Sequence, residues 1–328
     1  MIFRRKRSGK VLLDVTCAMA IVLLMVQMLI PAVHATREAA RRIRCAANLR
    51  SIGLAMTIHQ ESKGYWPSGG WHFNWIGEPE RGTGPRQPGS WVFNLLGYLG
   101  EDSLRSAGVS LTGRARHAAL RRRCATPLEL LHCPSRRPAL AYPYRENQRP
   151  FTSGGRLTTP LHRAAKTDYA ANVGDGASVE FDWKWPGPQS LEEGDAAAFV
   201  WPERTEFTGI VFGRSQIRPR HVVDGLSKTY LVGEKYVEAN KYQTGEDWGD
   251  NESLFAGFNN DNCRSTAEPP TADSAGGEFK TRFGSAHARI WQVVYCDGSV
   301  RAHDYATDRR IHRELGNRMN SRLRLERP

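Results

Sequence analysis

Acidic residues next to glycine give the sequence its first chemical signal. Asp224-Gly225 and Asp297-Gly298 each lie beside a β-branched and aromatic run, and Glu234 ends the run that follows the first pair. Because Asp-Gly is a strong tight-turn signal, Asp297-Gly298 predicts a hairpin between strands at 292–296 and 299–303. The same carboxylates, together with Asp261, could instead ligate a cation such as Ca²⁺. No contiguous calcium-loop motif is present, so turn chemistry is the favoured interpretation and calcium binding is the alternative.

His287 is the histidine with the most informative surroundings, because it precedes the predicted hairpin. We interpret it as a partly buried imidazole bonded to the backbone, with metal ligation or catalysis as the alternative. His221, His303 and His312 are scattered, and the sequence contains no H-E-x-x-H motif. It also contains no G-x-S-x-G motif, P-loop or G-x-G-x-x-G motif. We therefore expect a protein that is not an enzyme.

Six cysteines offer sulfur chemistry, of which Cys17 lies in an apolar segment and Cys45 in a helix-forming one. No C-x-x-C is present, which excludes zinc-ribbon and thioredoxin-like sites. If the body of the protein is exported to an oxidising compartment, its cysteines can form disulfides. We predict two of them, Cys124–Cys133, which closes a short loop, and Cys263–Cys296, which requires two distant segments to lie side by side.

Arginines and tryptophans are the candidate ligand-binding side chains. The arginines cluster in one segment, at Arg114, Arg116, Arg121, Arg122 and Arg123. A solvated helix face near an anionic membrane is the simpler interpretation, and binding of DNA or acidic polysaccharide is the alternative. The tryptophans lie in segments rich in Gly, Pro and acidic residues, at Trp71, Trp75, Trp183, Trp185 and Trp201. Packing is favoured for these rings over stacking on sugars.

A chain of 328 residues with 40% hydrophobic residues must position these groups, and its net charge is +12. This composition supports a folded core and excludes wholesale disorder. Excess positive charge suggests nucleic acid or an anionic membrane surface as a partner. Basic residues concentrate near the N-terminus and in residues 100–163, so part of this charge belongs to the segments that flank a membrane span.

Residues 11–33 are long and apolar enough to span a membrane as a helix. The basic residues at 4–7 favour a cytoplasmic N-terminus. Residues 34–62 are rich in Ala, Arg and Leu and predict a continuation of the helix, ended by Gly64 and Pro67. An apolar stripe along this continuation is expected to pack on the protein's own body, and it contains Ile43, Ala46, Leu49, Ile52 and Met56.

The start of the chain resembles a type IV prepilin signal. A basic leader ends at Gly9, and Asp14 is the fifth residue after it. The resemblance implies cleavage by a prepilin peptidase before Lys10, N-methylation, and pairing of Asp14 with the N-terminal amine of a neighbouring subunit. Lys10 and Asp14 stand where that family usually has Phe and Glu. An uncleaved anchor and a secretory signal cleaved after Ala35 are the alternatives.

Six strings then follow in a characteristic order. They are TREAARRIRCAANLRSIGLA at 36–55, WVFNLLGYL at 91–99, HCPSRR at 132–137, TDYAANVGD at 167–175, VVDGLSKTYLVGEK at 222–235, and FGSAH through CDGSVR at 283–301. With them the chain resembles a bacterial family of pilin-like envelope proteins known as "domain of unknown function fifteen fifty-nine". The closing motif of that family, a histidine, nine residues and Asp-Gly, corresponds to His287, Asp297 and Gly298. Asp224, Gly225 and Glu234 fall in the preceding string.

We therefore expect an α+β fold in which a long N-terminal transmembrane and amphipathic helix packs on a mainly antiparallel sheet with long loops. The expected segments are a leader (1–9), a transmembrane helix (10–33), its amphipathic continuation (34–62) and an extracytoplasmic body (63–328). The resemblance implies a non-enzymatic subunit of a type II secretion-like or type IV pilus-like assembly with other pilin-like subunits as partners. Its location would be the cytoplasmic membrane, with the N-terminus inside and the body periplasmic or extracellular.

The alternative function is an individually anchored module that binds carbohydrate, a cation, or a polyanion such as DNA. No cofactor is expected in either case.

Overall fold

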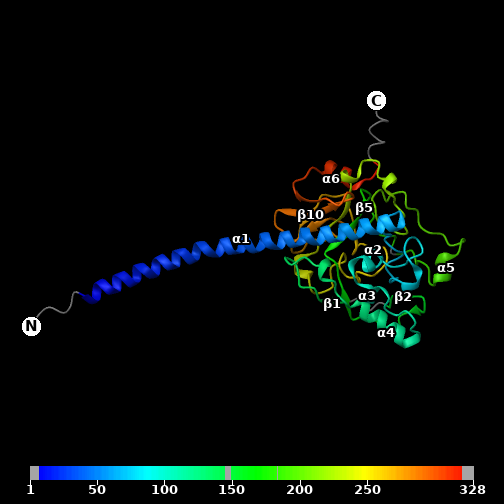
Figure 1. Cartoon of the computed structure of the whole chain (residues 1–328), viewed down its shortest axis with the longest axis horizontal. Helices are drawn as coiled ribbons and strands as arrows, with labels where there is room; N and C mark the ends of the chain where they lie inside the picture. Colours follow the sequence, from blue (N-terminus) through cyan, green and yellow to red (C-terminus); the bar gives the residue numbers. More distant parts are fainter. Residues whose placement is uncertain (1–6, 145–148, 183, 320–328) are drawn as a thin grey trace, which may run out of the picture. The chain divides into compact units, whose positions relative to one another are not determined.

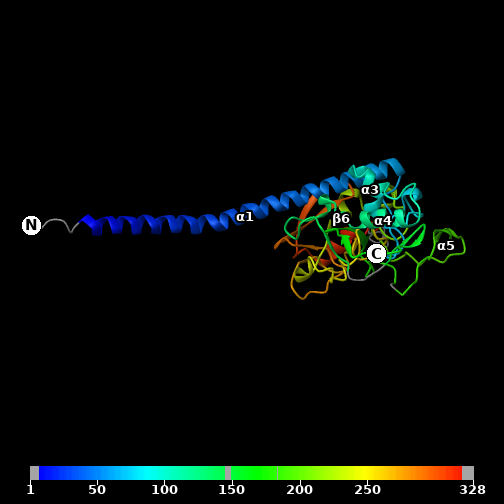
Figure 2. The same cartoon turned by 90° about the horizontal axis from the view of Figure 1, so that it is seen from below.

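A single helix, α1 (Arg7–Lys63), opens the chain and contributes to both of its compact units, Met1–Arg44 and Cys45–Pro328. The computed structural model describes residues 7–144, 149–182 and 184–319. Residues 1–6 of the predicted leader therefore lie outside the described residues. Figures 1 and 2 show the last turns of α1 lying against the folded unit to which they belong.

The composition of α1 explains its length, because Ala, Leu, Met and Arg are strong helix formers. Pro31 lies inside the helix, as prolines of membrane helices often do. The helix ends where the sequence predicts. Gly64 has a φ of +79° and its N–H donates to the carbonyl of Gln60 at 2.7 Å, and Pro67 follows.

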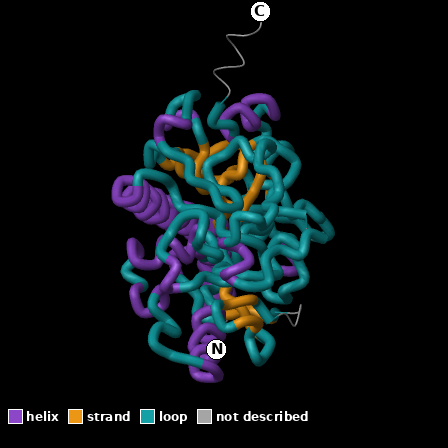
Figure 3. The backbone as a smooth tube through the Cα atoms, turned by 90° about the vertical axis from the view of Figure 1, so that its right-hand side faces the viewer, coloured by secondary structure: helices purple, strands orange, loops and turns teal. Residues whose placement is uncertain are grey.

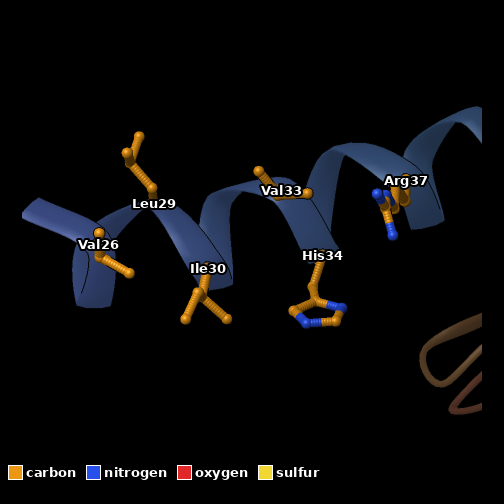
Figure 4. A pocket seen from close by; sticks show the side chains of 6 residues that line it. All are labelled: Val26, Leu29, Ile30, Val33, His34 and Arg37. Carbon is orange, nitrogen blue, oxygen red and sulfur yellow. The ribbon is translucent and has the colours of Figure 1, made fainter.

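The first half of α1 has the properties of a membrane-crossing helix by length and composition. Its most apolar window has a mean hydropathy of 2.3, and none of that window is buried. Figure 4 shows where this stretch ends: Leu29, Ile30 and Val33 are followed within one turn by His34 and Arg37. Exposed apolar surface of this extent is rare on soluble proteins, so this segment is either a membrane anchor or a signal sequence.

The second half of α1 belongs to the core of the folded unit. Leu49, Ile52 and Met56 are fully buried, which confirms the predicted stripe at these positions. Ile43, at the start of that stripe, is 69% exposed, and Cys45 extends the buried face instead. Burial of this helix face thus begins at Cys45, the first residue of the folded unit.

Gly53 lets α1 approach the sheet closely. A Cβ atom at this position would lie 2.6 Å from Val294 Cγ2, which is closer than carbon atoms can pack. Glycine inside a helix costs about 1 kcal/mol relative to alanine. Here the absence of a side chain allows the helix to lie close to a buried strand, which offsets that cost.

A five-stranded sheet with the order β11-β10-β6-β5-β7 forms the centre of the folded unit. Neighbouring strands are antiparallel except β5 and β7, which run parallel. Every residue of β5 and β6 is buried, so these strands are covered on both faces. The strands are β5 (Tyr169–Gly174), β6 (Tyr230–Glu234), β7 (Cys263–Ser265), β10 (Ile290–Tyr295) and β11 (Val300–Asp304).

The predicted hairpin is present, with its strands shifted by a residue or two. β10 and β11 pair through Gln292↔Ala302 and Val294↔Val300. Between them Gly298 has a φ of +82°, and Asp297 Oδ1 accepts hydrogen bonds from the backbone N–H and hydroxyl of Ser299. The carboxylate of Asp297 thus stabilises the turn, as Asp does at this position in many hairpins.

Short elements and loops make up the rest of the folded unit (Figure 3). The helices are α2 (Trp91–Leu95), α3 (Asp102–Arg105), α4 (Gly113–Cys124), α5 (Leu191–Asp195) and α6 (Arg309–Gly316). The remaining strands form two-stranded pairs: β1 (Ala141–Pro143) with β4 (Arg163–Ala165), β2 (Phe151–Thr152) with β3 (Gly155–Arg156), and β8 (Thr271–Ala272) with β9 (Gly284–Ser285). The fold is α+β, as predicted.

Candidate functional site

Four side chains with metal-binding or redox chemistry meet inside the folded unit. They are Cys45 of α1, Cys133 of the loop before β1, Glu234 at the end of β6 and His287 of the loop before β10. Their ligand atoms all lie within 4.8 Å of one another, and each residue is at most 1% exposed. We refer to these four residues as the sulfur cluster.

The four ligand atoms face one another. Cys45 Sγ lies 3.2 Å from Cys133 Sγ, and Cys133 Sγ lies 3.8 Å from His287 Nε2. The same imidazole nitrogen lies 3.3 Å from Glu234 Oε1. The other carboxylate oxygen, Oε2, accepts a hydrogen bond from the backbone N–H of Gln292 at 2.8 Å.

Backbone contacts fix the cysteine side of the cluster. The N–H of Cys133 donates to Asp168 Oδ2 at 2.7 Å. One turn beyond Cys45, Asn48 Nδ2 lies 3.2 Å from the carbonyl of His132 and 3.3 Å from the hydroxyl of Tyr169. These bonds tie α1 to the loop that carries Cys133, and so bring the two sulfurs together.

The sheet positions the other two members. Glu234 pairs with Tyr169 in the ladder between β6 and β5. The hydroxyl of Tyr305 holds the loop of His287 in place. It lies 2.8 Å from the carbonyl oxygens of both His287 and Ile290. The N–H of His287 also donates to Ser285 Oγ at 3.1 Å.

Protonation within the cluster is strongly perturbed. The hydrogen bond from Cys45 lowers the pKa of Cys133 to about 7, against the effect of burial. The same hydrogen bond, reinforced by burial, raises the pKa of Cys45 far above its usual value. Burial disfavours a charged imidazole, but contacts with Cys133 and Glu234 outweigh it and raise the pKa of His287 to about 10. The contacts within the cluster therefore favour the thiolate of Cys133 and the protonated form of His287 more than burial alone would.

A network of buried charges supports the loop of Cys133. Arg137 Nη2 lies 2.6 Å from Asp168 Oδ1, and the same guanidinium also contacts Asp250. Arg136 pairs with Asp273 at 2.9 Å and with Asp168 at 3.1 Å. Burial alone would raise the pKa of Asp168, but Arg137 and Arg136 lower it to about 2.

Lys235 extends this network from the residue after Glu234. Its Nζ lies 2.8 Å from Asp250 Oδ1 and donates to the carbonyls of Gly249 and Asp261 at 2.9 and 2.7 Å. Its side chain is fully buried. The buried charges thus link the end of β6 to the loop around Asp250, next to the sulfur cluster.

The sulfur cluster offers two sulfur ligands, one nitrogen and one oxygen. This set suits a thiophilic divalent cation such as Zn²⁺. The adjacent sulfurs also make Cys45 and Cys133 a pair that an oxidant could join. Glu234 and His287 were candidates from the sequence, whereas Cys45 was not, because nothing local indicated that α1 returns to the sheet. The signal that could have found it is its place in the first of the six strings.

The two predicted disulfides are absent from the structure, in which all six cysteines are free thiols. Cys133 lies next to Cys45 rather than Cys124, which ends α4 and packs in a separate apolar cluster with Leu120 and Ile76. Cys263 lies on β7, and Cys296 directly follows β10. Because β6 and β5 separate these strands, the two cysteines are about 14 Å apart across the sheet, too far for a disulfide.

The predicted calcium ligands do not gather in one place. Among the described residues, the group of potential ligands that lie close together contains Glu234 but not Asp224, Asp261 or Asp297. Asp224 and Gly225 precede β6 while Glu234 ends it, and Gly225 has a φ of +101°. The Asp-Gly pairs therefore serve turns.

The arginine-rich segment divides into an inner and an outer face of α4. Arg116 is buried and pairs with Glu78 at 2.6 Å and Glu80 at 3.0 Å. Arg123 is buried with its guanidinium 4.8 Å from the ring of Phe93. These two arginines are therefore not available to a polyanion. Arg114 and Arg122 are exposed and Arg121 is half-buried.

The tryptophans serve packing rather than an exposed sugar platform. Trp71 and Trp75 are fully buried with ring centroids 5.1 Å apart. Their indole N–H groups donate to the carbonyls of Pro85 and Pro188, each at 2.8 Å. Trp201 is partly buried against this group, Trp185 is partly buried against the main core and the ring of Trp201, and Trp183 lies outside the described residues.

The chain combines a long apolar N-terminal helix with an α+β body. Two thiols, an imidazole and a carboxylate form a buried cluster inside this body. The profile of the family described as "Protein of unknown function (DUF1559)" matches residues 34–310, and the chain belongs to this family. No curated protein and no solved structure matches the chain.

Removing one partner of the buried charge network should destabilise the folded unit severely. We expect Arg137→Leu to lower the free energy of unfolding by about 3–5 kcal/mol, because Asp168 and Asp250 lose a buried counter-ion. The matched control is Arg122→Leu, which removes an exposed arginine. Denaturant unfolding of the detergent-solubilised chain, followed by tryptophan fluorescence, measures both. Equal stability of the two variants would contradict the structural role of the network.

Proposed function

We propose that the protein is a non-enzymatic, single-pass envelope protein of pilin-like design, anchored in the cytoplasmic membrane by α1 with its body outside the cytoplasm. The observation that carries the proposal is the continuity of α1 from Arg7 to Lys63. Its first half is apolar and exposed, and its second half is part of the core of the body. One helix thus combines the lipid anchor with the central packing element, as in the pilin architecture that the N-terminal sequence resembles.

Asp14 gives the anchor a role in assembly under this proposal. Its carboxylate lies on the exposed apolar part of α1. A charged group in the bilayer is costly unless it is paired. Cleavage after Gly9 would make Asp14 the fifth residue of the mature chain and Lys10 the first. The α-amino group of a neighbouring subunit would then neutralise Asp14 and set the register between two helices.

The sequence beyond the membrane segment fits the same topology. Arg37 follows the apolar stretch within one turn of Val33, where a bilayer would meet water (Figure 4). Basic residues at 4–7 favour an N-terminus in the cytoplasm, where they would be removed with the leader. The prepilin peptidase and other pilin-like subunits are the partners that this route implies.

A second candidate function is that of an individually anchored module that binds a polyanion such as DNA or acidic polysaccharide. The observation in its favour is a hollow on the outer face of α4 that Arg114 and Arg121 line together with His117 and Thr158. Arg122 is exposed on the same helix. Three cations on one short helix could engage phosphate, sulfate or carboxylate groups without forming a polymer.

The mature N-terminus tests the export route. We expect intact-mass and N-terminal peptide analysis of the membrane fraction to give a chain that begins at Lys10, because the leader ends at Gly9. Gly9→Val should leave the leader attached, whereas the matched control Ser8→Ala should be processed normally. A chain beginning at Thr36 would identify a secretory signal, and an unprocessed chain an ordinary anchor; either result contradicts the pilin route.

Substitution of Asp14 tests the assembly role. We expect Asp14→Ala to abolish cross-linking between subunits in the membrane while the chain stays anchored, because the neighbouring amine loses its counter-ion. Asp14→Glu should retain cross-linking, since it keeps the carboxylate. The measurement is cross-linking followed by gel separation of membrane fractions. Undiminished cross-linking of Asp14→Ala would favour the individually anchored module.

The exposed arginines of α4 test the alternative function. If they bind DNA, alanine at Arg114, Arg121 and Arg122 should weaken binding and reduce the slope of log K against log salt by about 3, one for each phosphate contact. Fluorescence anisotropy with a labelled duplex at low salt measures this. The control variant removes three other exposed arginines, Arg289, Arg301 and Arg310. Equal losses in both variants, or no binding by the parent chain, would rule out a specific role for α4.

A further inference from the structure

We propose that Cys45, Cys133, Glu234 and His287 together bind one Zn²⁺ ion, and that this ion fastens α1 to the central sheet. The inference is independent of the export route. It rests on the geometry of the sulfur cluster, on its enclosure, and on the bonds that orient its members.

The spacing of the donor atoms matches a tetrahedral zinc site. Around a tetrahedron, zinc bonds of ordinary length place two sulfurs about 3.8 Å apart, a sulfur and a nitrogen about 3.6 Å apart, and a nitrogen and an oxygen about 3.3 Å apart. In the cluster the distances are 3.2 Å between the sulfurs, 3.8 Å from Cys133 Sγ to His287 Nε2, and 3.3 Å from that nitrogen to Glu234 Oε1, and all four donor atoms lie within 4.8 Å of one another. The two distances at His287 Nε2 therefore suit one ion as they stand, while the two sulfurs would have to move apart by about 0.6 Å to bind it.

The direction of the groups is as informative as their spacing. A single nitrogen of His287 faces both the sulfur of Cys133 and the carboxylate of Glu234. Glu234 Oε1 is buried, and no described group donates a well-aligned hydrogen bond to it. A cation at the centre would satisfy the thiols, the imidazole nitrogen and the carboxylate oxygen together, which one proton cannot do.

Bonds outside the cluster hold the ligands in place. Glu234 Oε2 accepts from the N–H of Gln292, which leaves Oε1 to face His287 Nε2. The N–H of Cys133 is held by Asp168, and Asn48 holds the neighbouring loop against α1. Supporting hydrogen bonds of this kind commonly orient metal ligands and tune the affinity of the site.

The role of the site follows from its closure. All four positions are filled by protein side chains, and each is at most 1% exposed, so no coordination position is left for water or substrate. The ion would therefore be structural. It would join the first residue of the folded unit, Cys45, to the loop of Cys133, to β6 and to the loop before β10.

A disulfide between Cys45 and Cys133 is the competing state. It would form when a disulfide oxidant takes up two electrons and the two thiols lose their protons, and it would leave Glu234 and His287 facing an uncharged pair of sulfurs. The convergence of four ligand atoms rather than two favours the metal. The two states differ in metal content and in the number of alkylatable thiols, so one preparation distinguishes them.

The test uses the full chain purified in detergent without chelator. Elemental mass spectrometry should find one zinc ion per chain, and Cys45→Ser, Cys133→Ser and His287→Ala should each reduce it to background. Cys124→Ser and Cys296→Ser are the matched controls, because each removes a buried cysteine outside the cluster and should keep the zinc. Zinc that persists in the Cys45→Ser and Cys133→Ser variants would overturn the proposal.

Measurements on the unsubstituted chain guard against variants that fail to fold. Replacement of zinc by Co²⁺ should produce the intense visible bands of a tetrahedral site with thiolate-to-cobalt charge transfer. Removal of the ion with a chelator should lower the melting temperature, and zinc should restore it. A metal-free chain overturns the proposal, whether peptide mapping finds a Cys45–Cys133 disulfide or two free thiols.

Discussion

The carboxylate of Asp168 lies fully buried between the guanidinium groups of Arg136 and Arg137, and much of the folded unit depends on this pairing. An interior charge without a partner costs several kcal/mol, so each of these residues is tolerable only when the others are in place. Asp250 and Asp273 complete the balance from two further loops. Ionic contacts thereby hold together long segments that lack the backbone hydrogen bonds of a helix or a strand ladder.

The need to pair buried charges also explains why several of the six sequence strings contain charged residues. Arg136, Arg137 and Cys133 come from one string, Asp168 from the next, and Glu234 and Lys235 from the end of another. His287 comes from the last string and Cys45 from the first. Strings that are far apart in the chain therefore meet at one buried polar centre. The exposed face of α4 lies outside this centre.

Local patterns in the sequence predicted the local structure well. Helix-forming composition and Gly64 defined the end of α1, and Asp297-Gly298 defined the β10–β11 hairpin. The candidate site was only partly predictable, since His287 and Glu234 were named while their contact with Cys45 depends on how the helix returns to the sheet. The disulfide predictions failed for the same reason, because strand order places two strands between Cys263 and Cys296. Arg116 and Arg123 were counted as surface charge because a run of arginines does not reveal which helix face turns inward.

The composition of the sulfur cluster has a consequence for the order of folding. Cys45 and Cys133 are separated by 88 positions, and Cys133 and His287 by a further 154. Contacts between such distant residues pay a large loop-closure entropy before they stabilise anything, which slows folding. A chain whose N-terminal helix is already placed must await the loop that carries His287 before the four side chains can meet. The cluster therefore forms late in folding, and a chain that stops short of His287 cannot form it.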